Sequence, residues 1–129
     1  EAVLEIKHSS VEMSPKIEGD ELTIKVDIKD KCTLSSLRGY ENISADAAIE
    51  LMRKTASEQI QVEVMKAVSK AKDLDCDFLG FAEEFHKKYP AKWEELETDW
   101  NDLFKKLHVE IKVQTSLINI GKMPIKPEQ

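Results

Sequence analysis

The first third of the chain alternates between apolar and polar side chains. The clearest alternation lies at residues 22–28, where every second side chain is apolar: Leu22, Ile24, Val26 and Ile28. A period of two predicts a strand with one buried face. A weaker alternation over residues 4–13 changes phase near Ser9–Ser10, which predicts another strand with a bulge. Residues 15–20 contain Pro, Gly and Asp and predict the turn of a hairpin. Residues 32–37 extend the second strand or start a third one.

From Ser44 onward, apolar side chains recur at steps of three and four residues. They are Ile49, Met52, Ala56, Ile60, Val64, Ala67, Val68 and Ala71. This period predicts one long amphipathic helix that ends near Lys72, with Ser44 as its N-cap. The opposite face is polar, and we expect it to be available to a partner. Its candidate contact residues are Glu50, Lys54, Glu58 and Gln61.

Two more helices and a last strand are predicted after residue 73. Asp77 can cap a helix with apolar positions at Phe78, Phe81, Ala82, Phe85 and Tyr89. Pro90 ends that helix. The next helix has its apolar positions at Trp93, Leu96, Trp100, Leu103, Phe104 and Leu107. Alternation then returns and predicts a strand from Val109 to Gly121.

The order of these elements predicts an α+β fold. Strands at both ends of the chain flank a helical block, in the order β-β-α-α-α-β. This order favours an antiparallel or mixed sheet of three to four strands with three helices packed on one face. With 129 residues, we expect one domain spanning residues 1–129.

Charge and composition argue against several classes of partner. The formal net charge is −6, so the chain has no broad attraction for phosphate backbones, and we expect no nucleic-acid partner. The same net negative charge argues against binding to anionic lipid through a polybasic segment. No apolar run approaches the ~18 residues of a membrane span.

The sequence carries no catalytic or metal-binding pattern. His8, His86 and His108 lie far apart, without a second ligand at the spacing of a metal site. Cys32 and Cys76 lack Cys-x-x-Cys spacing and are expected to be small, semi-buried side chains. Asp73, Asp75 and Asp77 alternate as in a calcium loop, but the required loop glycine is missing. We therefore expect no enzymatic activity, no catalytic residues, no metal and no cofactor.

Gly80 and the two tryptophans each allow two interpretations. Gly80 falls inside the predicted second helix, where it costs about 1 kcal/mol relative to Ala. Either the helix simply tolerates this cost at Gly80 or, as we favour, another backbone approaches so closely that a side chain would block it. Trp93 and Trp100 are seven residues apart on one helix face. They could line a ligand pocket, but their spacing with Leu96 and Leu103 favours a place in the core.

One set of motifs resembles a known family. It consists of Asp77-Phe-Leu-Gly80, then Pro90-Ala-Lys-Trp93, then Trp100 seven residues on, and a strand that ends at Gly121. This pattern resembles the C-terminal domain of the Ger(x)C (GerAC/GerBC-like) spore germination lipoproteins, the C subunits of germinant receptors. The likeness covers nearly the whole chain. The family often has a second glycine after Gly80, where this chain has Ala82, and basic residues at positions 119–120, where it has Asn and Ile.

The resemblance implies a role and a location. The chain would be the last domain of a larger subunit, whose lipid-modified cysteine lies outside this sequence. That subunit would sit on the outer surface of the inner spore membrane, beside the integral-membrane A and B subunits of the receptor. The implied function is non-enzymatic: receptor assembly or function in nutrient-induced germination. The alternative is direct binding of a small germinant, such as an amino acid or a sugar.

Overall fold

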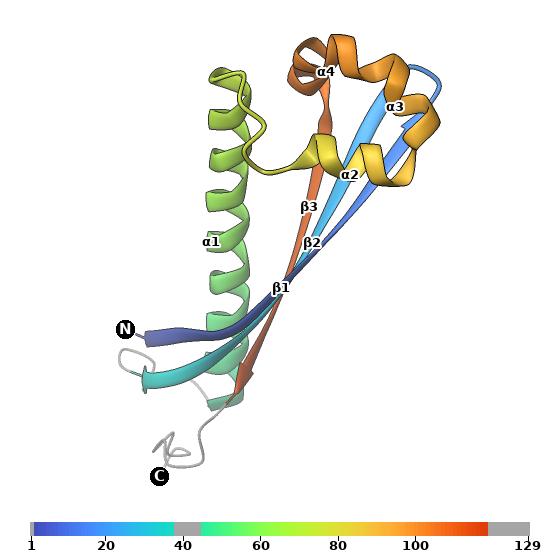
Figure 1. The fold of residues 1–129 in the computed structure, drawn as a ribbon. Coiled ribbons are helices and arrows are strands. Elements are labelled where there is room, and N and C mark those ends of the chain that lie inside the picture. The colour runs from blue at the N-terminus through green and yellow to red at the C-terminus, as the bar shows by residue number, and fades with distance from the viewer. Residues whose placement is uncertain (1, 38–44, 119–129) are drawn as a thin grey trace. The chain divides into compact units, whose positions relative to one another are not determined.

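The structure, a computed structural model, describes residues 2–37 and 45–118 (Figure 1). The strands are β1 (Ala2–Glu18), β2 (Glu21–Leu37) and β3 (His108–Ile118). The long helix is α1 (Ala45–Asp73), followed by α2 (Phe81–Lys88) and α3 (Pro90–Leu96). A 3-10 turn, η1 (Glu97–Asp99), joins α3 to α4 (Trp100–Lys106).

The predicted fold class is confirmed. The three strands form one sheet in the order β1-β2-β3. β1 and β2 form an antiparallel hairpin. β2 and β3 both start in one compact region of the chain and end in the other, so they run parallel and the sheet is mixed. The third predicted helix is the continuous segment α3–η1–α4, which gives the expected order β-β-α-α-α-β.

The hairpin turn is shorter than the sequence predicted. The turn was placed at residues 15–20, but β1 continues through Pro15 to Glu18, and only Gly19 and Asp20 form the turn. Gly19 has φ 59°, as the first position of a tight two-residue hairpin turn requires. Pro15 fits inside a strand because β1 is an edge strand, where a missing N–H breaks no ladder bond.

The chain divides into two compact units. Unit 1 draws on residues Glu1–Val11, Ile28–Gln61 and Val113–Gln129, and unit 2 on Glu12–Asp27 and Val62–Lys112. All three strands and α1 contribute residues to both units.

Unit 2 has an apolar core rich in aromatic rings. Its buried side chains are Leu22, Ile24, Val26, Val68, Ala71, Phe81, Phe85, Trp93, Trp100, Phe104 and Leu107. Trp100 lies at the centre of the ring contacts. Its ring centroid is 5.3 Å from Trp93, 5.7 Å from Phe85 and 6.0 Å from Phe104. The burial of both tryptophans agrees with their predicted place in the core.

Unit 1 has a smaller and more polar interior. Its buried apolar side chains are Ile28, Cys32, Ala48 and Met52, and its buried polar ones are Asp30, Thr33 and Thr115. The Ser9 hydroxyl donates to Oδ1 of Asp30 at 2.6 Å. Burial is the main cause that raises the pKa of the Cys32 thiol, and the nearby Asp30 carboxylate adds to it.

Several local predictions need correction. Ile6 and Val11, two apolar positions of the weaker alternation over residues 4–13, are 56% and 54% exposed, since an edge strand has a neighbour on one side only. Cys76 is exposed rather than semi-buried. The predicted N-cap Ser44 and the terminal Gly121 lie outside the described residues.

The start of the second helix also differs from the prediction. α2 begins at Phe81, so Phe78 is not on its apolar face and is 55% exposed. Gly80 precedes α2 at φ 82°, and a Cβ built there meets nothing within 4 Å. The proposed close backbone approach at Gly80 is therefore wrong. A side chain is disfavoured there because its backbone is left-handed, a conformation that glycine adopts without steric cost.

Candidate partner surface

The polar stripe predicted on the long helix lies on the surface of unit 1. Glu50, Lys54, Glu58 and Gln61 are all exposed on α1. Successive members are four, four and three residues apart, so they lie on one face of the helix. We call these four residues the α1 stripe. It carries charges of both signs, and none of its side chains is needed for the interior of unit 1.

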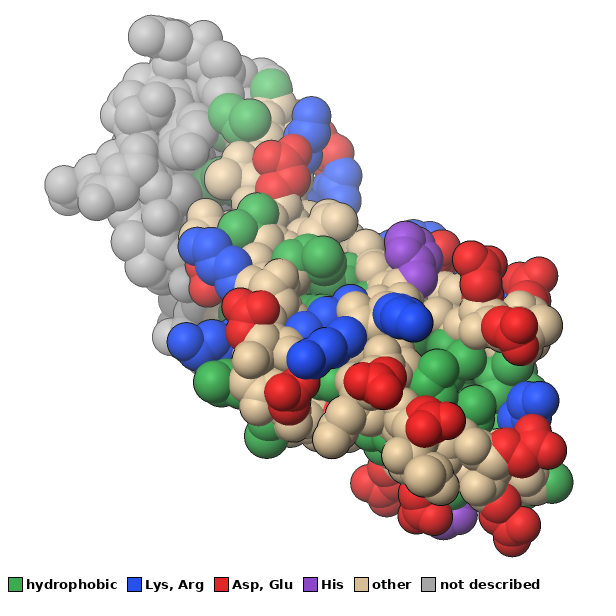
Figure 2. Space-filling view, turned by 90° about the horizontal axis from the view of Figure 1, so that it is seen from above, with side chains coloured by type: hydrophobic (Ala, Val, Ile, Leu, Met, Phe, Trp, Pro, Cys, Tyr) green, Lys and Arg blue, Asp and Glu red, His purple; other side chains and the backbone are tan. Residues whose placement is uncertain are grey.

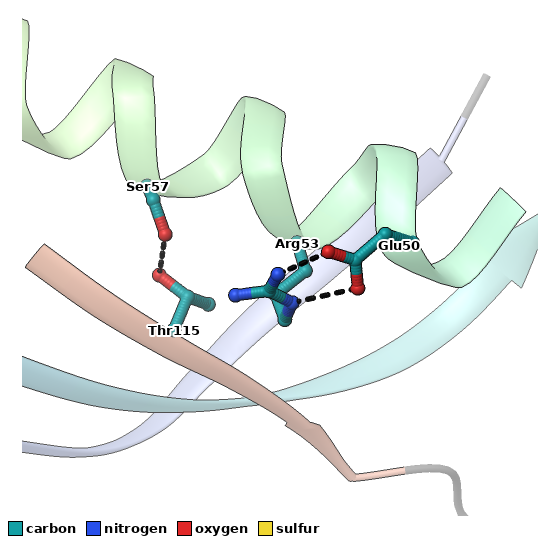
Figure 3. Close-up of polar contacts among 4 residues, drawn as sticks. All are labelled: Glu50, Arg53, Ser57 and Thr115. Atoms are coloured by element: carbon teal, nitrogen blue, oxygen red, sulfur yellow. Dashed lines mark hydrogen bonds and ion pairs between the residues drawn. The ribbon is translucent and has the colours of Figure 1, made fainter. Parts of the chain in front are cut away.

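One end of the α1 stripe is fixed by an ion pair (Figure 3). The Arg53 guanidinium donates to Glu50 twice: Nε to Oε2 at 3.0 Å, and Nη2 to Oε1. The hydrogen bond from Arg53 is the largest cause that lowers the pKa of the Glu50 carboxyl below its usual value. Glu50 therefore stays ionised at any physiological pH. Exposed pairs of this kind contribute little to stability, so this one serves mainly to orient the two side chains.

The neighbouring side of the same helix is tied to the sheet. Ser57 on α1 donates to Oγ1 of Thr115 on β3 at 2.8 Å, as Figure 3 shows. Thr115 is 3% exposed, so this bond satisfies a hydroxyl that has little access to water. The contact orients this part of α1 within unit 1 and leaves the α1 stripe facing solvent.

The histidines and aspartates that were screened for chemistry have structural or surface positions. The His86 ring stacks 5.8 Å from Trp93, and His108 Nε2 lies 3.7 Å from Glu110 Oε1. Asp75 pairs with Lys105 at 3.0 Å, and Asp77 bonds to backbone N–H groups of α2. Among the described residues, no group of three or more His, Cys, Asp or Glu side chains could hold a metal ion.

Two hollows offer room for a small molecule. The one in unit 2 has a volume of about 530 Å³ and is lined by Asp20, Glu21, Leu22, Thr23, Leu103, Lys106 and His108. The one in unit 1 measures about 480 Å³ and is lined by His8, Ser10, Lys29, Asp30, Lys31, Gln114 and Ser116. The charged side chains of both are exposed, apart from the buried Asp30. In the face drawn in Figure 2, acidic, basic and apolar side chains are interspersed.

The motif residues from Asp77 to Trp100 lie in unit 2, whereas Gly121 lies outside the described residues. Asp77 and Gly80 shape the approach to α2, Pro90 is in the first turn of α3, and Trp93 and Trp100 are buried. Proline suits that first turn because its missing N–H would have no helical partner there. The motif thus organises the turns and core of unit 2, whereas the α1 stripe belongs to unit 1.

The comparisons with known proteins agree with this motif. Residues 1–121 match the family described as Spore germination B3/GerAC like, C-terminal. The chain belongs to this family. The resemblance to the Ger(x)C proteins is therefore confirmed, and the buried tryptophans and helix-approach residues are how this member builds unit 2.

Two proteins similar to this GerAC-like domain are longer than it. Spore germination protein KC of Bacillus subtilis (strain 168) is 23% identical over 126 residues, which is 95% of this chain and 31% of that protein. The crystal structure of the GerBC protein matches with a TM-score of 0.78 at 15% identity, over 92% of this chain and 41% of that one. The structural match to GerBC shows that this chain has the same fold as the matched part of that protein. The chain spans less than half the length of both proteins.

The sequence did not reveal the hydrogen-bond partners of the buried Asp30 and Thr115 in this GerAC-like domain. The Ser9–Asp30 and Ser57–Thr115 bonds join residues 21 and 58 positions apart. The position of Asp30 does carry a signal, because it continues the buried phase of Ile24, Val26 and Ile28. A carboxylate in that phase indicates a buried polar partner.

Proposed function

We propose that this GerAC-like domain is the C-terminal part of a non-enzymatic C subunit of a spore germinant receptor, and that it acts in receptor assembly. The match of residues 1–121 to a spore germination family carries this proposal. The Bacillus subtilis relative is named as a spore germination protein, which supports a role in germination. In this role the domain offers a shaped surface to partners in nutrient-induced germination and performs no chemistry.

The α1 stripe is the surface that we assign to assembly. Its side chains are exposed and unit 1 does not need them for its interior, so they are free to serve a contact. Charges of both signs along one helix face give register and specificity rather than raw affinity, because like charges opposed at an interface are costly.

The partners that we propose are the integral-membrane A and B subunits of the receptor. None of the described helices is long and apolar enough to cross a membrane. Attachment to the outer surface of the inner spore membrane would come from a lipid anchor outside this sequence. The domain would then meet its partners at the membrane surface through side chains such as those of the α1 stripe.

Charge reversal along the α1 stripe tests this assignment. The variant combines Glu50→Lys, Lys54→Glu and Glu58→Lys in the full-length protein in spores. We expect each change to alter the free energy of unfolding of the purified domain by no more than about 0.5 kcal/mol, as exposed substitutions usually do. Receptor levels in spore membranes and the germination rate should fall.

The matched control combines Lys92→Glu, Glu94→Lys and Glu95→Lys on α3, which are equally exposed and change the net charge by the same amount. It should leave receptor levels and germination unchanged. Normal receptor levels and normal germination in a folded α1 variant would exclude the α1 stripe as the assembly surface. Assembly would then have to use another face, such as the exposed Lys25, Glu110 and Lys112 of unit 2.

A second candidate function is the direct binding of a small germinant. The unit 2 hollow favours it, because its volume is within the range of ligand sites and it combines acidic with basic side chains. Calorimetry of the purified domain with candidate germinants separates the two functions. Saturable heat that Lys106→Ala abolishes would support binding, and its absence would leave assembly as the function.

A further inference from the structure

The connection between α1 and α2 presents two large apolar side chains to solvent. Leu74 is 59% exposed and Phe78 is 55% exposed. We call residues 74–80 the α1–α2 loop, the segment that leaves the upper end of α1 in Figure 1. Leaving an aromatic ring in water forgoes the ~1.5–3 kcal/mol that its burial would provide. The question is whether the ring is merely on a loose segment or is held out on a fixed one.

The first half of the α1–α2 loop is fixed by the end of α1. The N–H of Cys76 bonds to the carbonyl of Ala71 at 2.9 Å, and the N–H of Asp75 bonds to that of Lys72 at 3.2 Å. This is the double bonding of a Schellman motif, which usually places glycine in the left-handed position. Here Asp75 occupies that position with φ 51°. Its carboxylate pairs with Lys105 Nζ on α4 at 3.0 Å, which helps to hold the strained residue in place.

The second half of the loop is fixed by Asp77. Its Oδ1 accepts from the N–H of Phe81 at 3.0 Å, and its Oδ2 accepts from the N–H of Ala82 at 2.6 Å. Two of the free N–H groups at the start of α2 are thereby satisfied, and the negative charge suits the positive end of the helix dipole. The Phe78 N–H also bonds to the Cys76 carbonyl at 2.8 Å. Phe78 thus lies between two anchored points.

These contacts make Phe78 a preorganised anchor. A side chain on a backbone that is already fixed requires less ordering when it enters a pocket, so less of its burial energy is lost to conformational entropy. Aromatic side chains that fill pockets are typical hot spots of protein interfaces. We propose that the α1–α2 loop is a docking element, with Phe78 and Leu74 inserting into an apolar pocket that has a basic rim on a partner protein.

The charge around the loop identifies the kind of partner. From Asp73 to Glu84 the sequence contains five carboxylates and no Lys, Arg or His. Of these carboxylates, Asp75 is paired with Lys105, and Glu83 and Glu84 lie near Lys87. Asp73 remains exposed beside Leu74. An acidic border around an apolar tip is complementary to a pocket rimmed by Lys or Arg.

The same charges argue against two other occupants. An anionic membrane surface attracts basic segments and would repel the negative charge of Asp73 and Asp77, the two of the five carboxylates that lie in no ion pair of the described residues. A second copy of this chain would bring identical acidic borders together, which is costly. A partner protein is therefore the occupant that the loop fits. The search for this partner in the spore membrane rests on the proposed function. The docking loop itself lies in unit 2 and is a different surface from the α1 stripe.

Site-specific photocrosslinking in spores tests the proposal. A benzophenone amino acid is incorporated at the exposed position 76 of the full-length protein, between Leu74 and Phe78. We expect an adduct with one membrane protein, and mass spectrometry should map it to an apolar site flanked by Lys or Arg. Phe78→Ser together with Leu74→Ser should reduce the adduct at least tenfold. Raising the salt concentration of isolated membranes should weaken it further.

The matched control is Val62→Ser with Met65→Ser, two apolar side chains of unit 2 that are 50% and 41% exposed on α1. It removes a similar apolar area and should leave the adduct unchanged. Adducts with lipid alone, with a second copy of the protein, or with nothing would overturn the proposal, as would equal losses in loop and control variants. Thermal melting of both variants shows whether they fold. Loss of germination in the α1 stripe variant, with normal germination in the loop variant, would reject the docking loop and retain the proposed function.

Discussion

The interiors of the two units are built from different chemistry. Unit 2 packs Trp93, Trp100, Phe85 and Phe104 against one another, with ring centroids 5.3–6.0 Å apart in the contacts of Trp100. Unit 1 encloses Asp30, Thr33 and Thr115 beside four smaller or flexible apolar side chains. The same sheet and the same long helix therefore support an aromatic interior in one unit and a hydrogen-bonded interior in the other.

This difference teaches where stability and specificity come from. Burial of apolar area stabilises without regard to direction, so the core of unit 2 depends on volume and shape. A buried polar group contributes only when its partner is present with good geometry. Unit 1 therefore depends on a few particular bonds, and Oδ2 of Asp30 has no protein partner among the described residues. We expect large, graded losses from changes in unit 2 and smaller, partner-dependent losses in unit 1.

Truncating the aromatic core should have the largest effect. Trp93→Ala or Trp100→Ala removes a buried ring and leaves a cavity, at a cost of about 3–5 kcal/mol. Thermal or urea unfolding of the purified domain measures the loss. Phe78→Ala is the control, because that ring is exposed and its removal should cost little. Parental stability in both Trp variants would mean that these rings are not the core of unit 2.

The bond between exposed Ser9 and buried Asp30 should show an intermediate and non-additive effect. Ser9→Ala leaves the Asp30 carboxylate buried without its donor, at a cost of about 1–3 kcal/mol. Adding Asp30→Val to Ser9→Ala removes the unpaired charge and should recover part of that loss. The double-mutant cycle is measured by urea unfolding. Strictly additive losses would show that the pair does not couple and that the interior of unit 1 is less polar than described.

The two cysteines should show the smallest effect on stability. One lies in each unit, so their reactivity allows a direct comparison of the two units. Burial raises the pKa of Cys32, so the folded chain keeps this proton at a pH where the unfolded chain has released it. The free energy of unfolding should therefore fall as the pH rises above the ordinary thiol pKa, and Cys32→Ala should remove this slope. In native protein, a thiol reagent should label exposed Cys76 at once. It should label Cys32 only through opening of unit 1, at a lower free energy than global unfolding. Equal labelling rates for both thiols would contradict the burial of Cys32.

The elements of the fold were readable in the sequence because each is encoded by a local period. The alternation from Leu22 to Ile28 and the three-and-four spacing from Ile49 to Ala71 each predicted an element of the right type, and α1 ends at Asp73, one residue past its predicted end. The family motif was readable for a similar reason. Pro90, Trp93 and Trp100 act within one short segment, so their spacing survives in the linear sequence.

What the sequence alone determined was the order and type of the elements, the burial of the aromatic face and the family. Only the tertiary structure decided how the remaining polar groups are used. Pro15 remains in a strand because β1 is an edge, and its carbonyl accepts a bond from Lys88, 73 residues away. The Asp30 carboxylate accepts a hydrogen bond from Ser9, and Lys72, at the predicted end of the long helix, donates to the Leu107 carbonyl at 2.6 Å. Phe78 lies in an exposed loop and not in the predicted helix. Asp77 accepts hydrogen bonds from the N–H groups of Phe81 and Ala82, so α2 starts at Phe81. A local period records which side chains avoid water, but a hydrogen bond between distant residues leaves no periodic trace, because its two partners meet only after the chain has folded.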